Sequence, residues 1–302
     1  MTKRDLLMVT DLSSDEVNDI LVLAGREPAA LGRPLAGLGA ALIFEKPSNR
    51  TRQSMEIAVV QLGGHPVYTR GEEIQFDVRE PVEDVGRTLA GYHGLVCARV
   101  FKHSVVERLA SCCSVPVVNM LSDASHPMQA LADALTMTQV HGGLRGATVA
   151  WVGDYNNVAR SLGEVCVLLG ARVHYSCPTG YGPGDAELAR LSALGDGDAA
   201  FFAEPVAAVA GAVAVHTDTW TSMGQEAEKA ARIEAFRGFG VTTELMSKAA
   251  AGAGFYHCMP AYRGYEVDAA VIDGPGSQVI AQGHNRLHAS RALLAFLLGV
   301  RP

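Results

Sequence analysis

The segment 48–52 (Ser-Asn-Arg-Thr-Arg) combines two hydroxyls and two guanidiniums with the expected start of a helix. Unpaired amides and the positive end of a helix favour a bound anion, and the guanidinium fork matches the oxygens of a phosphate. The segment lacks the G-x-x-x-x-G-K-S/T form, so a nucleoside triphosphate loop is not expected. It predicts a site for a phosphate-like anion, with a capped helix and solvated arginines as the alternative.

Two further polar residues stand where strands are expected to end. His126 comes directly before Pro127, so it either occupies an N-cap position in extended geometry or serves a functional site. Gln129 lies one turn into the same helix and can aim its amide at the same pocket. Arg99 closes the apolar strand 96–99, and a charge at the end of a buried strand is a candidate for function.

A second set of polar residues lies in the other half of the chain. The segment 153–157 has one glycine where a dinucleotide turn needs three, so a nicotinamide cofactor is not expected. Asn156 and Asn157 offer amide donors and acceptors that suit a small zwitterion. Asp218 follows an apolar strand and either caps a helix or offers a carboxylate to an ammonium, with the amides of 222–224 available for a carboxylate.

Cys258 is the remaining residue of chemical interest. A lone cysteine is most often a small buried apolar residue, and the adjacent His257 points to the opposite face of the strand. A Cys/His nucleophilic pair is therefore not expected. No cluster has the spacing of zinc ligands, so we expect no metal. The six cysteines show no C-x-x-C spacing, which favours a reducing cytoplasm.

Composition limits the classes of protein. The 302 residues suggest two domains, and 48% hydrophobic with 19% charged residues is ordinary for a globular chain. The net charge of −7 gives no support for binding nucleic acid or an anionic membrane. The apolar runs are too short for a signal peptide or a membrane span, so neither is expected.

Strands and helices alternate along the chain. We expect strands at 40–44, 66–69, 95–99, 116–119, 148–152, 172–176, 212–217 and 254–258. We expect helices at 14–25, 51–62, 81–92, 103–112, 126–140, 158–169, 185–194 and 285–298, and a short one after Pro205. The region 180–198 is expected to be surface loop and amphipathic helix.

This rhythm predicts an α/β protein with two doubly wound parallel-sheet domains. The expected domains are 1–140 and 141–284, with the helix of 285–302 packing back on the first. Ligands of open α/β sheets bind at the carboxyl ends of the strands, where the polar residues described above lie. We expect the active site in the cleft between the domains.

The motifs together resemble a known family. The segment 48–52 resembles the S-x-R-T-R signature of transcarbamoylases, and 126–129 resembles their H-P-x-Q. The segments 218–224 and 257–260 resemble the D-x-x-x-S-M-G loop and the H-C-L-P segment of ornithine carbamoyltransferases, which aspartate carbamoyltransferases lack. The segments 154–161 and 285–288 also match, and all occur in the family's order across nearly the whole chain. Met128, Met259 and Tyr262 replace a usual cysteine, leucine and histidine.

The resemblance implies transfer of the carbamoyl group of carbamoyl phosphate to the δ-amine of L-ornithine, giving L-citrulline and phosphate. No cofactor is implied. It implies that the phosphate is held by Ser48, Asn49, Arg50, Thr51 and Arg52, with Gln75 from a neighbouring subunit. It also implies that Arg99, His126 and Thr51 donate to the carbonyl oxygen. The carbamoyl amino group would be oriented by Gln129, Arg286 and the turn of Cys258 and Met259.

The resemblance also assigns the second substrate. Ornithine's α-ammonium and α-carboxylate would be held by Asn157, Asp218, Ser222 and Met223, and Cys258 would lie beside the δ-amine. The catalytic residues implied are Arg50, Arg99, His126, Cys258 and Arg286. A cis Met259–Pro260 bond and a homotrimer or multiple of trimers are implied as well. The alternatives are another amine (putrescine, N-acetylornithine or aspartate), a catalytically silent paralogue, and a nucleotide-dependent dehydrogenase.

Overall fold

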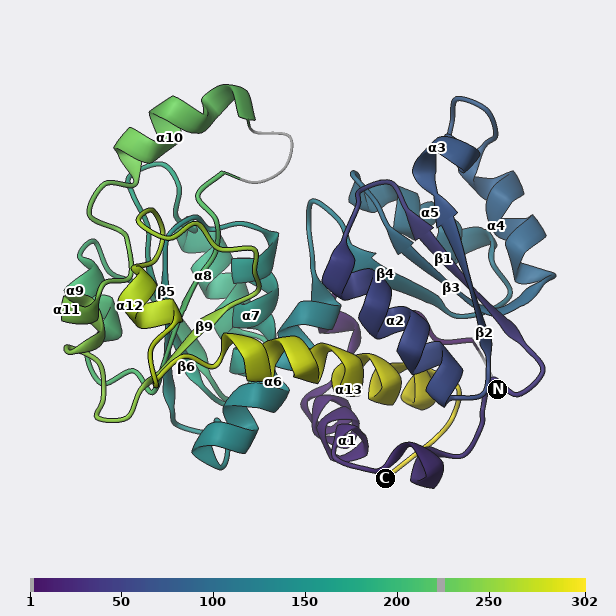
Figure 1. The fold of residues 1–302 in the computed structure, drawn as a ribbon, viewed down its shortest axis with the longest axis horizontal. Coiled ribbons are helices and arrows are strands. Elements are labelled where there is room, and N and C mark those ends of the chain that lie inside the picture. The colour runs from purple at the N-terminus through teal and green to yellow at the C-terminus, as the bar shows by residue number, and fades with distance from the viewer. Residues whose placement is uncertain (1–2, 222–225) are drawn as a thin grey trace. The chain divides into compact units, whose positions relative to one another are not determined.

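The computed structural model describes residues 3–221 and 226–302. The chain divides into two compact units, unit 1 (Met1–Leu135 with His284–Pro302) and unit 2 (Thr136–Gly283). Each unit contains one parallel sheet, so the predicted α/β class with two parallel sheets is confirmed. Two helices, α6 (Pro127–His141) and α13 (Val279–Leu297), contribute residues to both units (Figure 1). In the described parts of the chain, no helix has the length and apolar character needed to cross a bilayer.

Unit 1 holds a four-stranded sheet in the order β2-β1-β3-β4. The strands are β1 (Gly39–Phe44), β2 (His65–Arg70), β3 (His93–Arg99) and β4 (Val117–Leu121). The helices that belong wholly to this unit are α1 (Ser14–Ala24), α2 (Asn49–Gln61), α3 (Gly71–Ile74), α4 (Val82–Ala90) and α5 (His103–Cys112). In the register of the sheet, Phe44 pairs with Arg99 and Arg99 pairs with Leu121. The carboxyl ends of β1, β3 and β4 therefore lie together at one edge.

The core of unit 1 follows from the alternation of side chains along β1. Ala41 and Ile43 pack into a cluster with buried valines and leucines of α4 and α5. Successive side chains of a strand point to opposite faces, so the buried Leu42 lies on the other face of the sheet. The helix at 14–25 is also found, as α1, and its Ser13/Glu16 capping box is present. Both faces of the sheet therefore carry buried apolar side chains.

Unit 2 holds a five-stranded sheet in the order β7-β6-β5-β8-β9. The strands are β5 (Thr148–Val152), β6 (Arg172–Ser176), β7 (Asp198–Phe201), β8 (Ala214–Thr217) and β9 (Gly254–His257). The helices are α7 (Asn157–Leu168), α8 (Asp185–Ser192), α9 (Pro205–Val209), α10 (Lys229–Ala235), α11 (Thr243–Met246) and α12 (Ala269–Ile272). The sequence did not predict β7, a four-residue edge strand with no fully buried side chain, because such a strand lacks an apolar pattern.

A buried histidine, His216, makes the stability of unit 2 depend on pH. His216 on β8 is 2% exposed, and its ring stacks on Tyr256 at 4.6 Å. Burial, together with the nearby His257 and His141, lowers the pKa of His216 to about 3. The folded state therefore keeps this imidazole neutral, whereas the unfolded chain binds a proton near pH 6.5.

We expect the free energy of unfolding of unit 2 to be highest above pH 6.5 and to fall as the pH drops from 6.5 towards 3. The slope from this one group is up to about 1.4 kcal/mol per pH unit, because the unfolded state binds the extra proton. Urea unfolding at pH 7.5, 6 and 5 measures it. His216→Phe keeps a ring against Tyr256 and should reduce the slope. Equal slopes in the two proteins would contradict this origin.

Candidate active site

The predicted anion segment forms the beginning of α2. Ser48 is the N-cap residue, and its Oγ accepts a hydrogen bond from the Thr51 amide at 3.4 Å. Capping and an anion site are compatible, because capping satisfies only one of the free amides of the first turn. Arg52 forms an ion pair with Glu56 (2.8 Å), and its guanidinium lies 3.7 Å from the Tyr68 ring centroid. The ion pair with Glu56 uses the Nε–H of Arg52, and a guanidinium carries four further N–H groups that can donate to a phosphate.

Three of the predicted residues meet in the interior of unit 1, although they come from α2, α6 and α13. Arg286 donates to Thr51 Oγ1 at 2.9 Å and also to Gln129 Oε1. Gln129 Nε2 in turn donates to Asp133 Oδ1 at 2.6 Å. All four side chains are buried. Asp133 was not predicted from the sequence, because its only signal is its position one turn after Gln129 on the same helix.

His126 and Arg99 complete this donor cluster, which we define as Thr51, Arg99, His126, Gln129 and Arg286. His126 directly precedes α6, and its carbonyl accepts from the Gln129 amide at 3.0 Å. Burial lowers the pKa of His126 well below its usual value, and the positive charges of Arg286 and Arg99 lower it further. The imidazole is therefore neutral at physiological pH and can donate one N–H. Two guanidiniums and a neutral imidazole are suited to an oxygen atom that gains negative charge.

In unit 2, Asp218 is held at the end of β8 by three donors. Its Oδ1 accepts from the Thr219 amide (2.8 Å) and from Cys258 Sγ (3.2 Å). Its Oδ2 accepts from Asn156 Nδ2 at 2.9 Å. These contacts place the carboxylate in a loop, beside side chains of the turn after β9 and of the β5–α7 loop.

The two asparagines of the β5–α7 loop have different positions. Asn156 is the N-cap of α7, where its Oδ1 accepts from the amides of Val158 and Ala159. Its amide nitrogen is therefore directed at Asp218. Asn157, the residue that the family resemblance assigns to ornithine, is the first residue of α7 and is half-buried. The resemblance did not assign Asn156, although a second amide in the same loop was its signal.

Cys258 follows β9 in a turn that contains a cis Met259–Pro260 bond, which confirms the expectation from the resemblance. His257 Nδ1 accepts from the Met259 amide at 2.8 Å, and its Nε2 lies 3.3 Å from Glu266 Oε1. Both His257 and Glu266 are buried. The imidazole thus orients the turn that carries the thiol. Glu266 was missed, because no motif links it to the H-C-x-P segment.

Asp218, His257 and Cys258 each offer a potential metal-ligand atom, and these atoms lie within 4.8 Å of one another. The lone pair of His257 Nδ1 already accepts the Met259 amide, and Nε2 carries the proton that faces Glu266. No lone pair of the imidazole is then left for a cation. This triad therefore fits a hydrogen-bonded turn rather than a metal site.

One predicted residue of the described part of the chain stands apart from these clusters. Gln75 ends α3 with a left-handed backbone (φ 50°) and is exposed. Ser222 and Met223 lie outside the described residues.

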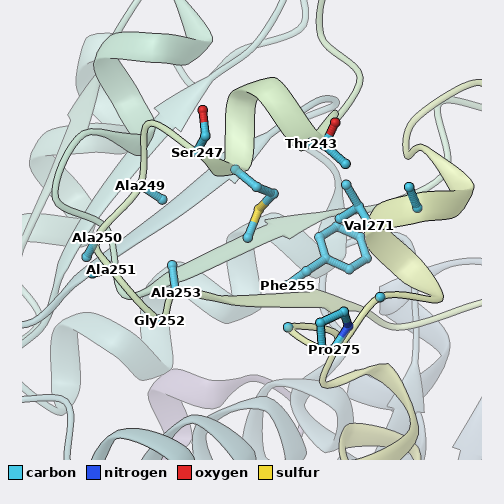
Figure 2. A pocket seen from close by; sticks show the side chains of 14 residues that line it. Thr243, Ser247, Ala249, Ala250, Ala251, Gly252, Ala253, Phe255, Val271 and Pro275 are labelled. Atoms are coloured by element: carbon cyan, nitrogen blue, oxygen red, sulfur yellow. The ribbon is translucent and has the colours of Figure 1, made fainter.

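A cavity of about 350 Å³ lies beside β9, apart from these clusters (Figure 2). Short side chains such as Ala249 and Ala253 line it, with no titratable group among its lining residues, so it cannot supply an acid, a base or a charge.

Comparison with known proteins gives matches along nearly the whole chain. Residues 4–139 match the aspartate/ornithine carbamoyltransferase carbamoyl-P binding domain, and residues 145–297 match the Asp/Orn binding domain. The ornithine carbamoyltransferase of Thermus thermophilus is 46% identical, over 98% of this chain and 97% of that protein. The solved ornithine carbamoyltransferase of Pyrococcus furiosus is 42% identical with a TM-score of 0.92, over 99% of this chain and 98% of that one.

A more distant solved neighbour is an acetylornithine transcarbamylase complexed with acetylcitrulline. It is 29% identical with a TM-score of 0.87, over 98% of this chain and 99% of that one. The two domain matches cover most of the chain, and the identity to the Thermus protein extends over nearly its full length. The chain therefore belongs to the aspartate/ornithine carbamoyltransferase family.

Proposed function

We propose that this chain is an ornithine carbamoyltransferase, which converts carbamoyl phosphate and L-ornithine into L-citrulline and phosphate. The observation that carries the proposal is the buried donor cluster of unit 1, which stands at the family's motif positions. The 46% identity to the ornithine carbamoyltransferase of Thermus thermophilus supports the same activity. The residue roles that follow are part of the proposal.

The first task is to hold a dianionic phosphate. Ser48 and Thr51 offer hydroxyls, Asn49 a backbone amide, and Arg50 and Arg52 positive charge, all from the first turn of α2. The positive end of this 13-residue helix adds to the attraction. Carbamoyl phosphate bound in this way presents its carbonyl group towards the rest of the donor cluster.

The second task is to stabilise the carbonyl oxygen during attack. The neutral δ-nitrogen forms a bond to the carbonyl carbon, and the C=O electron pair moves onto oxygen. Arg99, His126 and the Thr51 hydroxyl donate to that oxygen, where preorganised donors have their greatest effect. Gln129, Arg286 and the turn of Cys258 and Met259 orient the carbamoyl amino group. The tetrahedral intermediate then collapses with cleavage of the bond from carbon to the phosphate oxygen.

The third task is to present an uncharged amine. An amine with a pKa near 10 is about 99.9% protonated at pH 7, so the site must select or generate the neutral form. Asp218 pairs with the α-ammonium of ornithine, and Asn157 with Ser222 and Met223 holds the α-carboxylate. Cys258, which donates to Asp218, lies beside the δ-amine. The departing phosphate is the final proton acceptor.

The proposal includes a cytoplasmic homotrimer or multiple of trimers, without a cofactor, metal, nucleic-acid or membrane partner. Gln75 of a neighbouring subunit would then reach the phosphate. The exposure of Gln75 supports this role, since an exposed side chain is accessible to a neighbouring subunit. Sedimentation of the wild type tests the assembly.

A steady-state assay with carbamoyl phosphate against a panel of amines tests the activity. We expect ornithine to exceed N-acetylornithine, putrescine and aspartate in kcat/KM, with citrulline as the product. A preference for N-acetylornithine would instead indicate the activity of the solved acetylornithine transcarbamylase. Turnover of none of the four would favour a silent paralogue.

Arg50→Ala tests the phosphate site. We expect carbamoyl-phosphate affinity to fall about 10- to 150-fold, because a charge-assisted hydrogen bond contributes about 1.5–3 kcal/mol. Calorimetric titration measures the affinity, and circular dichroism should barely change. Arg145→Ala, which removes an exposed arginine paired with Asp196, is the control and should bind like wild type. Wild-type affinity in Arg50→Ala would remove Arg50 from the site.

A further inference from the structure

Arg232 on α10 is a buried cation that the reaction as proposed does not use. It is 4% exposed, and its guanidinium forms an ion pair with Asp154 at 2.6 Å. Its Nε also donates to the carbonyl of Trp220. The rings of Tyr181 and Phe236 have their centroids 4.8 and 5.3 Å from its Cζ. Arg232 thus joins two loops of unit 2 through one planar, closely packed group.

These two loops carry the residues proposed for the amine. Asp154 lies two residues before Asn156, and Trp220 lies two residues after Asp218. The bond from Asn156 Nδ2 to Asp218 links the same loops a second time. The contacts therefore form a closed ring, which runs from Asp154 through Arg232 to Trp220, along the chain to Asp218, and back through Asn156.

We infer that Arg232 is a positioning residue for the amine site, which holds the loops after β5 and β8 in register so that the Asp218 carboxylate faces the substrate's α-ammonium. The inference rests on the proposed function. Arg232 touches no substrate in this account and acts through Asp154 and the Trp220 carbonyl. Glu228, 3.7 Å away, is a second and more exposed carboxylate partner.

The charge balance of the region supports this role. Burial raises the pKa of Asp154 to about 6, the Arg232 charge opposes this rise, and the neighbouring Asp218 adds to it. Without Arg232, Asp154 would either carry an uncompensated charge beside Asp218 or take up a proton. A buried ion pair is weakly stabilising compared with apolar packing, so stability alone gives little reason for it. A better reason for the ion pair is that it fixes the geometry of the two loops that carry the proposed amine-binding residues.

The experiment compares Arg232→Met, Arg232→Lys, Asp154→Asn and the double variant Arg232→Met/Asp154→Asn with wild type. We expect Arg232→Met to raise the KM for ornithine at least 10-fold, with a smaller fall in kcat. The dissociation constant of carbamoyl phosphate, measured alone, should stay within twofold of wild type, because the residues assigned to its phosphate and its carbonyl oxygen lie in unit 1. Arg232→Lys keeps a charge but not the fork, so its KM should be intermediate.

Arg237→Met is the matched control. Arg237 stands on the same segment, just after α10, is paired with Glu234 at 2.6 Å, and its side chain is 77% exposed. We expect its KM for ornithine to equal that of wild type. The double variant distinguishes an effect of Arg232 on the geometry of the amine site from an effect on the stability of the fold. Loss of the unpaired carboxylate should return the melting temperature towards wild type, whereas the KM for ornithine should stay raised.

Two results would overturn the inference. One is a KM for ornithine within twofold of wild type in Arg232→Met, and the other is a KM that recovers together with the melting temperature in the double variant. The wild type is assayed first, so that failure of the proposed function is seen separately. If the wild type prefers another amine, the same variants are compared with that amine. If it reacts with none, the proposed function and the inference both fall.

Discussion

Replacing His126 with alanine should lower kcat about 10²- to 10³-fold, the usual loss when one donor to a developing oxyanion is removed. His126 is buried beside Arg99 and Arg286, and their charges and its burial keep its pKa well below the usual value. The side chain therefore acts as a neutral N–H donor rather than as an acid. Steady-state kinetics with saturating carbamoyl phosphate measures the loss.

The pH dependence of kcat follows from the neutral state of the His126 imidazole. Since the imidazole does not titrate near neutral pH, the profile of kcat between pH 6 and 9 should show no ionisation that His126→Ala removes. His126→Gln, which keeps an N–H donor, should retain more activity than the alanine variant. If His126→Ala lowered only the melting temperature and left kcat intact, the residue would serve only to begin α6.

Asp218→Asn should lower kcat/KM for ornithine at least about 100-fold, mainly through KM, and leave carbamoyl-phosphate binding near wild type. Sites that pair with a substrate group discriminate by factors up to about 10⁴. The amide also fits its surroundings poorly. Both oxygens of Asp218 accept from donors, so an NH₂ in place of either oxygen faces a donor and loses that bond.

A matched control is Asp196→Asn, which removes an exposed carboxylate paired with Arg145 in the same unit. It should change neither kinetics nor affinity. The wild type should also reject N-acetylornithine, which has lost the α-ammonium, and putrescine, which lacks the α-carboxylate. Unchanged ornithine kinetics in Asp218→Asn would mean that the amine is recognised elsewhere, and the assignment of the second substrate would fail.

The elements that could be predicted are those with strong local patterns. Local sequence patterns predict α1 from the capping box of Ser13 and Glu16, and β1 and β5 from their apolar runs. Each of these patterns lies within a few residues. The short helices α11 and α12 and the edge strand β7 were missed. Each has only four residues, and its stability comes from packing against distant parts of the unit rather than from its own periodicity.

The same distinction applies to the candidate site. The motifs identified Thr51, Gln129 and Arg286, and the structure shows that they meet. The partners that orient such residues were not predictable. Asp133, Glu266 and Arg232 belong to no motif; Asp133 acts on Gln129 one turn away on the same helix, whereas Glu266 and Arg232 act on residues that only the fold brings near. Residue type and spacing therefore located the groups that could touch substrate, whereas the groups that hold them in place required coordinates.

The separation of the two residue sets has an evolutionary consequence. On the proposed assignment, the residues for the phosphate and the carbonyl oxygen lie in unit 1, whereas Asn157 and Asp218, which hold the amine, and the positioning residue Arg232 lie in unit 2. Substitutions around Asp218 can therefore change the acceptor while the unit 1 residues for the phosphate and the carbonyl oxygen stay intact. A single ancestral scaffold can diversify in this way into enzymes with different acceptors, and the solved acetylornithine transcarbamylase, of the same fold at 29% identity, is the outcome that such divergence would leave.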